Sequence, residues 1–233
     1  MVDGLDRSDS APENRRFDGC STLGIVSSID ADLWERAAPL YDLQRVLERR
    51  ALRVLAGMLE SAGALRGPVL DLGTGTGAML QALSERPEPP AVVVGMDSSR
   101  GMLSRVGPLP AGWRVEYADA RALPCDAGSL EAVSAAYLLH VLEPDDRRTV
   151  LAETRCVLRP GGMLGTVTIA PWAGLVTPLL SASSRRAMRS IGPLAGMRIL
   201  DPRPELLAAG FEPVSARTVR RGYPSLCVVS GRR

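Results

Sequence analysis

The stretch VLDLGTGTGAML, residues 69–80, places a single carboxylate, Asp71, directly before a segment that contains three glycines. The apolar residues before the glycines predict a short strand, and the apolar residues after them predict a helix. Glycine between the two allows the backbone to turn sharply and a ligand to approach it closely. Gly73, Gly75 and Ala78 also match the G-x-G-x-x-G/A spacing of dinucleotide-binding turns, so we expect a ligand site here.

The charge of Asp71 bears on which ligand this turn binds. A carboxylate at the strand end repels a pyrophosphate and attracts an ammonium or sulfonium group. S-adenosylmethionine carries both cationic groups and no phosphate, and Asp97 follows at about the 20-residue distance where an acid contacts a ribose. The pattern favours this cofactor, and an NAD(P)-dependent oxidoreductase stays open as the alternative.

Strand and helix patterns alternate on both sides of the glycine turn. We expect strands at 69–72, 91–96, 113–117, 130–136 and 163–170, and helices at 30–62 (divided by Pro39), 78–86, 99–105 (capped by Ser98), 144–158 and 205–209. Two further strands, 211–219 and 225–230, can form an antiparallel hairpin. The sequence therefore predicts an α/β fold, a doubly wound, mostly parallel, seven-stranded Rossmann-like sheet that ends in this hairpin.

The 233 residues suffice for one α/β domain with additions. Residues 1–27 are polar and without period, which predicts a disordered tail, and residues 28–233 are expected to form the single domain. The segment 171–200 breaks the alternation of strands and helices and carries apolar residues at helical spacing. We expect it to be a small helical lid on the substrate side, with Trp172 against the substrate.

The composition excludes several classes of function. All 28 basic residues are arginine, so the chain lacks the lysine of Schiff-base enzymes and of phosphate-binding P-loops. A net charge of +2 and 4% aromatic residues do not favour nucleic acid as a partner. The four cysteines form no C-x-x-C pair, so we expect reduced thiols and no metal site. Without an apolar run of about 18 residues or a signal-peptide pattern, we expect a cytoplasmic protein with no stable membrane insertion, monomeric or homodimeric.

Four motifs in order resemble those of the class I S-adenosylmethionine-dependent methyltransferases. They are DLGTGTG at 71–77, the acid Asp97, the acid Asp119, and LRPGG at 158–162. The resemblance covers roughly residues 30–230, and four ordered motifs are more specific than one glycine turn. The stretch WERAAPLYD at 34–42 is similar to a segment that precedes these motifs in the ubiquinone/menaquinone-biosynthesis-like branch (methyltransferase type 11).

The resemblance implies a role for each matching residue. The cofactor, which leaves as S-adenosylhomocysteine, would contact the turn and the strand ends: Asp71, Leu72, Gly73, Thr74, Gly75, Gly77, Asp97, Ser98, Met102, Asp119, Ala120 and Tyr41. Asp71 would accept from the ammonium of the methionine part, Asp97 from both ribose hydroxyls, and Asp119 with the backbone at Ala120 from the adenine amine. Asp119 precedes Ala-Arg, and the alternative is that it caps a local turn.

Methyl transfer requires alignment and exclusion of water, and it requires a base only where the acceptor must lose a proton. The single histidine, His140, follows the expected fourth strand and has a side chain whose ordinary pKa suits a base near neutrality. A structural role for His140 is the alternative, and Tyr137 is a second candidate for contact with cofactor or acceptor. Tyr41, Tyr137, His140 and Trp172 would surround the acceptor, which the apolar lid indicates is a small, largely apolar molecule such as a specialised metabolite, quinone precursor or lipid.

Other functions remain as rivals to this hypothesis. A nucleic-acid methyltransferase is disfavoured by the charge and by the absence of an Asn/Asp-Pro-Pro-Tyr/Phe-type motif after the fourth strand. A regulatory protein that binds S-adenosylmethionine without catalysis stays open. The C-terminal segment 221–227 differs from the ending expected of a true quinone methyltransferase, which places the quinone acceptor in doubt.

Overall fold

The computed structural model describes residues 41–170, 198–222 and 224–233. The predictions for the tail, for the helix before residue 41 and for residues 171–197 of the lid lie outside these residues.

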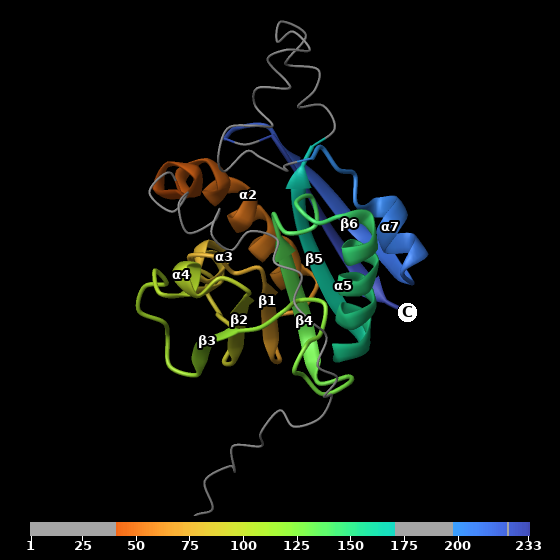
Figure 1. The fold of residues 1–233 in the computed structure, drawn as a ribbon, viewed down its shortest axis with the longest axis horizontal. Coiled ribbons are helices and arrows are strands. Elements are labelled where there is room, and N and C mark those ends of the chain that lie inside the picture. Colours follow the sequence, from red (N-terminus) through yellow and green to blue (C-terminus); the bar gives the residue numbers. More distant parts are fainter. Residues whose placement is uncertain (1–40, 171–197, 223) are drawn as a thin grey trace, which may run out of the picture.

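The described residues form one seven-stranded sheet with helices on both faces (Figure 1). In chain order the elements are α2 (Tyr41–Ser61), β1 (Val69–Leu72), α3 (Ala78–Ser84), β2 (Val93–Asp97), α4 (Arg100–Leu103), β3 (Trp113–Tyr117), β4 (Leu130–Ala136), α5 (Pro144–Val157), β5 (Leu158–Ile169), α7 (Arg203–Ala208), β6 (Phe211–Val219) and β7 (Ser225–Arg232). The strand order is β3-β2-β1-β4-β5-β7-β6. β1 to β5 are parallel, and β7 runs antiparallel to both β5 and β6, so the predicted mixed sheet with a terminal hairpin is confirmed.

Each face of the sheet has its own apolar core. Side chains alternate along a strand, so Val69 of β1 packs on one face and Leu70 on the other. Val69 belongs to the core that α2 and α3 cover, and Leu70 belongs to the core on the side of α5 and α7. The central strands are covered on both sides, which is why they consist of nearly unbroken apolar runs.

The start of β5 corrects the predicted boundaries. The sequence predicts a helix that ends at Leu158 and a strand that begins at Met163, because Pro160 and Gly161 usually interrupt regular structure. In the structure β5 begins at Leu158, which pairs with Leu130 of β4, and the pairing resumes at Met163 with a register shift. The residues between form an irregularity inside the strand, and Gly161 takes a φ of 75° there.

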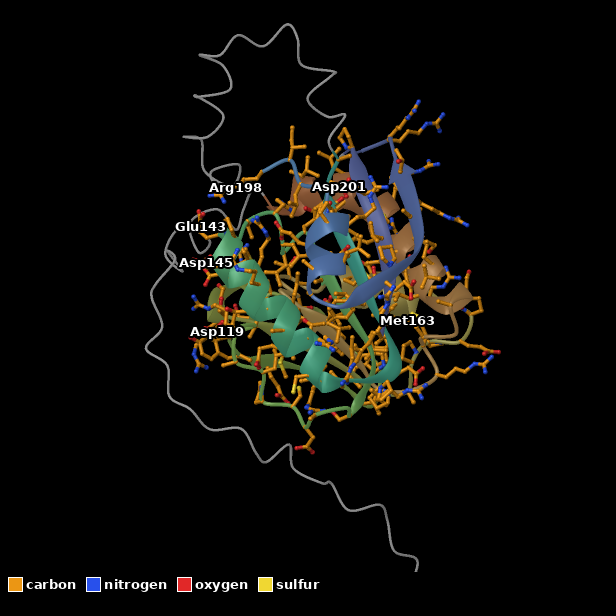
Figure 2. The ribbon with its side chains drawn as sticks, turned by 90° about the vertical axis from the view of Figure 1, so that its right-hand side faces the viewer. Asp119, Glu143, Asp145, Met163, Arg198 and Asp201 are labelled. Carbon is orange, nitrogen blue, oxygen red and sulfur yellow. The ribbon has the colours of Figure 1, made fainter. Side chains whose placement is uncertain are left out.

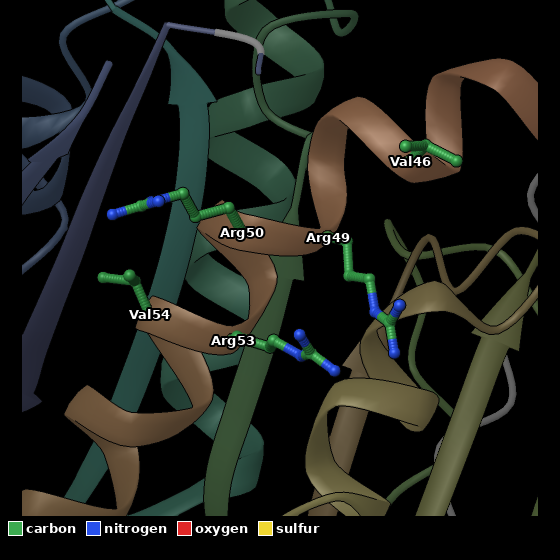
Figure 3. Close-up of a pocket in the computed structure, with 5 residues that line it drawn as sticks. All are labelled: Val46, Arg49, Arg50, Arg53 and Val54. Atoms are coloured by element: carbon green, nitrogen blue, oxygen red, sulfur yellow. The ribbon is translucent and has the colours of Figure 1, made fainter. Parts of the chain in front are cut away.

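Two apolar residues near the start of α2, Val46 and Leu47, are exposed. Val46 is 70% exposed although it belongs to the apolar pattern that predicted this helix. Figure 3 shows Val46 beside Arg49, Arg50 and Arg53 around a surface hollow on α2. Within the described part of the chain, no helix is long and apolar enough to cross a membrane.

Candidate functional site

The turn after β1 depends on glycines in the left-handed region of the backbone. Gly73, Gly75 and Gly77 have φ values of 66°, 55° and 83°, which other residues rarely adopt. A Cβ atom on Gly73 would lie 3.0 Å from Cδ1 of Leu138, in the segment after β4. The predicted glycine turn is therefore present, and its backbone lies against the carboxyl end of β4.

Leu72 and Thr74 are buried beneath this turn. Leu72 is 0% and Thr74 is 5% exposed. A cofactor in the turn would therefore contact the backbone of these two residues and not their side chains. The amide of Thr74 donates to the carbonyl of Met96 at 3.0 Å, which ties the turn to the end of β2. The turn is thereby fixed against two neighbouring strands.

Asp71 is a buried carboxyl group beside the turn. It is 1% exposed, and its Oδ1 accepts a hydrogen bond from Oγ of Ser134 at 2.6 Å. Burial raises the pKa of Asp71 to about 6, against the opposing effects of the Ser134 and Thr74 hydroxyls. Its Oδ2 is buried and has no hydrogen-bond partner within normal bonding geometry among the described residues. Such an acceptor requires a donor, and a cationic amine is the donor that would also favour the ionised form.

Asp97 joins the end of β2 to the glycine turn. Its Oδ2 accepts from the amide of Gly75 at 2.9 Å, and its Oδ1 accepts from the amide of Ser99 at 2.8 Å. Burial raises the pKa of Asp97, and these amides oppose the shift. Because a carboxylate oxygen accepts more than one hydrogen bond, each oxygen keeps capacity for a hydroxyl group.

The helix after Asp97 begins one residue later than predicted. Ser99, not Ser98, is its cap, and the Ser99 hydroxyl accepts from the amide of Met102 at 3.2 Å. The helix is also short, Arg100–Leu103, instead of 99–105. Ser98 is exposed and Met102 is buried. Of the two predicted contacts, therefore, Ser98 is the accessible one, and Met102 supports the loop from below.

Asp119 is the third acid at a strand end, and Arg121 donates to both of its carboxylate oxygens. Oδ1 accepts from the Arg121 amide at 2.9 Å and from Nε at 3.0 Å, and Oδ2 accepts from Nη2 at 2.8 Å. The guanidinium of Arg121 lowers the pKa of Asp119. The local turn that the sequence analysis kept as an alternative is thus present. Ala120 between them is partly buried.

Tyr137 adopts a backbone conformation that is unusual for its type. Its φ is 57°, the one positive value among the non-glycine residues that the structure describes. Its amide donates to the carbonyl of Val167 at 2.8 Å, and its hydroxyl lies 2.7 Å from Oγ of Ser225 at the start of β7. Strain of this kind concentrates at functional sites, because surrounding contacts must over-determine it.

His140 lies next to Tyr137, with the two ring centroids 5.8 Å apart in an edge-on arrangement. It is 0% exposed, and neither ring nitrogen has a hydrogen-bond partner in the part of the chain that the structure describes. Burial lowers the pKa of His140 to about 4. The expectation of a pKa near neutrality is therefore wrong, because it ignored the cost of burying the imidazolium form.

Two predicted contacts cannot be placed. Tyr41 is the first residue of α2, but its side chain lies outside the described residues, as does the whole of Trp172. In the ranges that the structure describes, no group of three or more histidine, cysteine or acidic side chains could hold a metal ion.

Sequence reasoning missed three residues that shape this site. Ser134 is the cross-strand partner of Asp71 in the β1–β4 register, and a polar residue inside an apolar strand was the available signal. Arg121 was noticed only as a neighbour of Asp119. Ser225 lies far away in sequence and reaches Tyr137 only through the antiparallel hairpin.

A methyltransferase domain model matches residues 69–162, which include the glycine turn and all three acids. The chain is 34% identical over 168 residues to a ubiquinone/menaquinone biosynthesis C-methyltransferase of Desulfotalea psychrophila, covering 69% of this chain and 66% of that protein. It is 35% identical over 178 residues to the enzyme of the same name from Syntrophotalea carbinolica, covering 72% of each. A malonyl-[acyl-carrier protein] O-methyltransferase of Methylococcus capsulatus is 32% identical over 195 residues, with 82% of this chain and 69% of that protein covered.

Solved structures share the fold. The magnesium protoporphyrin IX methyltransferase of Synechocystis PCC 6803 with bound SAH superposes with a TM-score of 0.62 at 17% identity, covering 91% of this chain and 90% of that one. A putative methyltransferase of Haloferax volcanii, in complex with its Trm112 activator, gives a TM-score of 0.64 at 17% identity, with coverage of 88% and 99%.

Proposed function

The chain belongs to the class I S-adenosylmethionine-dependent methyltransferases, in the branch of the ubiquinone/menaquinone C-methyltransferases, and we propose that it methylates a small, largely apolar acceptor. S-adenosylmethionine is its cofactor. This cofactor supplies a methyl group on a sulfonium, which an acceptor atom displaces in line.

The observation that supports our assignment of the cofactor site is the pairing of a left-handed glycine turn with two acids that keep hydrogen-bonding capacity, the buried Asp71 and the partly buried Asp97. Oδ2 of Asp71 lacks a donor, which fits the ammonium of the methionine part. Asp97 is already oriented by backbone amides, which fits a role in accepting from ribose hydroxyls. The exposed Ser98 and the residues Asp119 and Ala120 would border the adenine.

The segment after β4 supports an apolar acceptor. Tyr137, Leu138, Val141 and Leu142 are all partly exposed, and the first carboxylate along this segment is Glu143. An apolar surface beside the transferred methyl group would exclude water and align a hydrophobic substrate. Trp172 and Tyr41 are proposed to complete this surface.

Tyr137 is proposed to border both cofactor and acceptor. Its strained backbone and its hydroxyl contact with Ser225 fix the ring at the carboxyl end of β4. His140 lies behind it in the core. Since burial keeps the imidazole neutral and no partner orients it, we propose that His140 packs against Tyr137 and that catalysis does not depend on its titration.

Calorimetric titration tests the cofactor site, and an assay for S-adenosylhomocysteine release tests the acceptor class. We expect micromolar binding of S-adenosylhomocysteine and no binding of NADH. The relatives' names point to two acceptor types, a carbon atom in ubiquinone or menaquinone biosynthesis and an oxygen atom of malonyl-[acyl-carrier protein]. Turnover with a naphthoquinol or another apolar ring, and not with hydrophilic acids of similar size, would support the proposal. Turnover only with the hydrophilic acids would contradict it.

A further inference from the structure

Arg121 connects two carboxylates from different parts of the fold. Its Nε and Nη2 donate to Asp119 after β3, and its Nη1 donates to Asp146 in the first turn of α5 at 3.2 Å. The side chains of Arg121 and Asp146 are each 24% exposed. Figure 2 shows Asp119 along the same edge of the molecule as Asp145 and Glu143, where α5 begins.

This triad fixes both the charge and the direction of the Asp119 carboxylate. A bidentate guanidinium holds a carboxylate in a single plane, which a lysine cannot do. The carboxylate is ionised at neutral pH, and the guanidinium lowers its pKa further, so both oxygens are hydrogen-bond acceptors only. With two carboxylates and one guanidinium, the triad has a net charge of −1, which favours a ligand atom that donates over one that accepts.

The proposed cofactor brings such a donor to this end of the site. Adenine carries an exocyclic amine at C6, whereas hypoxanthine carries a carbonyl oxygen there. A fixed, ionised carboxylate can accept from the amine but is repelled by the oxygen. We propose that Arg121 is a positioning residue that, by holding the Asp119 carboxylate in a fixed plane, makes this site selective for adenine over hypoxanthine. The inference rests on the proposed cofactor site.

The alternative is that Arg121 only braces the segment after β3 against α5. In that case Arg121 would affect the binding of both nucleosides equally, because their ribose and homocysteine parts are the same. Loss of a positioning residue instead weakens the adenine compound selectively. Selectivity between the two nucleosides therefore distinguishes the roles, which a measurement of stability or of total activity would not.

The experiment compares binding of S-adenosylhomocysteine with binding of S-inosylhomocysteine, in which an oxygen replaces the adenine amine. The wild-type protein is expected to prefer the adenine compound by about tenfold or more. In Arg121→Ala, affinity for the adenine compound should fall about tenfold while affinity for the inosine compound changes less than about twofold. Arg121→Lys should recover part of the preference.

Two further variants complete the test. Arg148→Ala is the matched control, because it removes a guanidinium that pairs with Asp145 on the same helix and does not contact Asp119. It should leave the preference unchanged. Asp119→Asn keeps the shape of the side chain and supplies an amide that can donate to oxygen, so it should lose the preference even if Arg121→Ala fails to fold.

The outcomes separate the two levels of inference. If wild-type protein binds neither nucleoside, the proposed cofactor site itself is wrong. If it binds S-adenosylhomocysteine but Arg121→Ala weakens both compounds alike, or neither, Arg121 does not set selectivity and the proposal is overturned. An unchanged preference in Asp119→Asn would overturn it as well.

Discussion

The acids after β1 and β2 differ from the acid after β3 in what holds them. Asp71 and Asp97 are held by a hydroxyl and by backbone amides, and burial raises both pKa values. Asp119 is held by a guanidinium, which lowers its pKa. Among the described residues, Asp71 and Asp97 therefore lack a cationic partner, while the negative charge of Asp119 is already compensated by Arg121. The same residue type at equivalent strand ends thus fits the two different roles that we propose: binding a cation or hydroxyls, and recognition of the adenine base.

The largest effect on cofactor affinity is expected from a change in the glycine turn, because Asp71 and Asp97 both lie beside it. Gly73→Val would force a β-branched residue to a φ of 66° and bring its Cβ to 3.0 Å from Leu138. The turn must then shift, and S-adenosylhomocysteine affinity should fall more than about 100-fold. The control is Gly63→Val, at a φ of 72° with no atom within 4 Å of an added Cβ, which places the same β-branched residue in the left-handed region away from the site. Equal binding by both variants would contradict this role of the turn.

Removal of Asp97 should have the next largest effect. In Asp97→Ala the two ribose hydroxyls lose a charged acceptor, and the affinity for S-adenosylhomocysteine should fall by roughly 1.5–3 kcal/mol in binding free energy, measured by calorimetry. The amides of Gly75 and Ser99 also lose their partner, so part of this loss reflects a looser turn. A loss as large for a 2′,3′-dideoxy analogue as for the parent nucleoside would assign the whole effect to the turn.

Asp71 should make the unliganded protein less stable at neutral pH. Its folded pKa of about 6 lies above the ordinary 3.8, so the folded protein binds more protons between these values. Stability therefore falls as the pH rises from about 4 to 6, and the cost persists above that range. Asp71→Asn should raise the free energy of unfolding at pH 7.5 by roughly 1–3 kcal/mol, with a gain that shrinks toward pH 4. Denaturant unfolding at both pH values measures it, and a destabilised variant at pH 7.5 would contradict the buried charge.

Replacement of His140, which follows β4, is expected to have the smallest effect on binding and turnover. Its side chain contrasts with those of the three acids. It is also buried and shifted toward its neutral form, but it has no hydrogen-bond partner and no charge to bring to a ligand. His140→Leu should raise the free energy of unfolding by about 1 kcal/mol, since it removes unsatisfied buried polar atoms. S-adenosylhomocysteine affinity and turnover should remain within about twofold. A large loss of turnover with unchanged binding would instead make His140 catalytic.

The order of elements could be predicted from the sequence because each depends on local signals. Val69–Leu72 is apolar up to three glycines, and Trp113–Tyr117 and Leu130–Ala136 are bounded by turn residues, so these strands were predicted with the bounds observed. The bounds of β5 could not be predicted, because its continuation through Pro160 depends on pairing with β4 rather than on local preference.

The positions of the three acids at strand ends could also be predicted from the sequence, but the directions of their pKa shifts could not. The sign of each pKa shift depends on burial and on partners distant in sequence. Ser134 reaches Asp71 only through strand register, and Asp146 reaches Arg121 only through the position of α5. The lowered pKa of His140 could not be predicted for the same reason, since nothing in the sequence shows that its side chain is fully buried.

The central claim is that a cation completes the bonding of Asp71, and proton release on binding tests it most directly. With a pKa of about 6, Asp71 is partly protonated near pH 6, and an ammonium at Oδ2 would ionise it. Calorimetry of S-adenosylhomocysteine binding at pH 6, in two buffers of different ionisation enthalpy, should show release of a fraction of a proton by the wild type and none by Asp71→Asn. Binding without proton release by the wild type, or equal release by both proteins, would contradict the account.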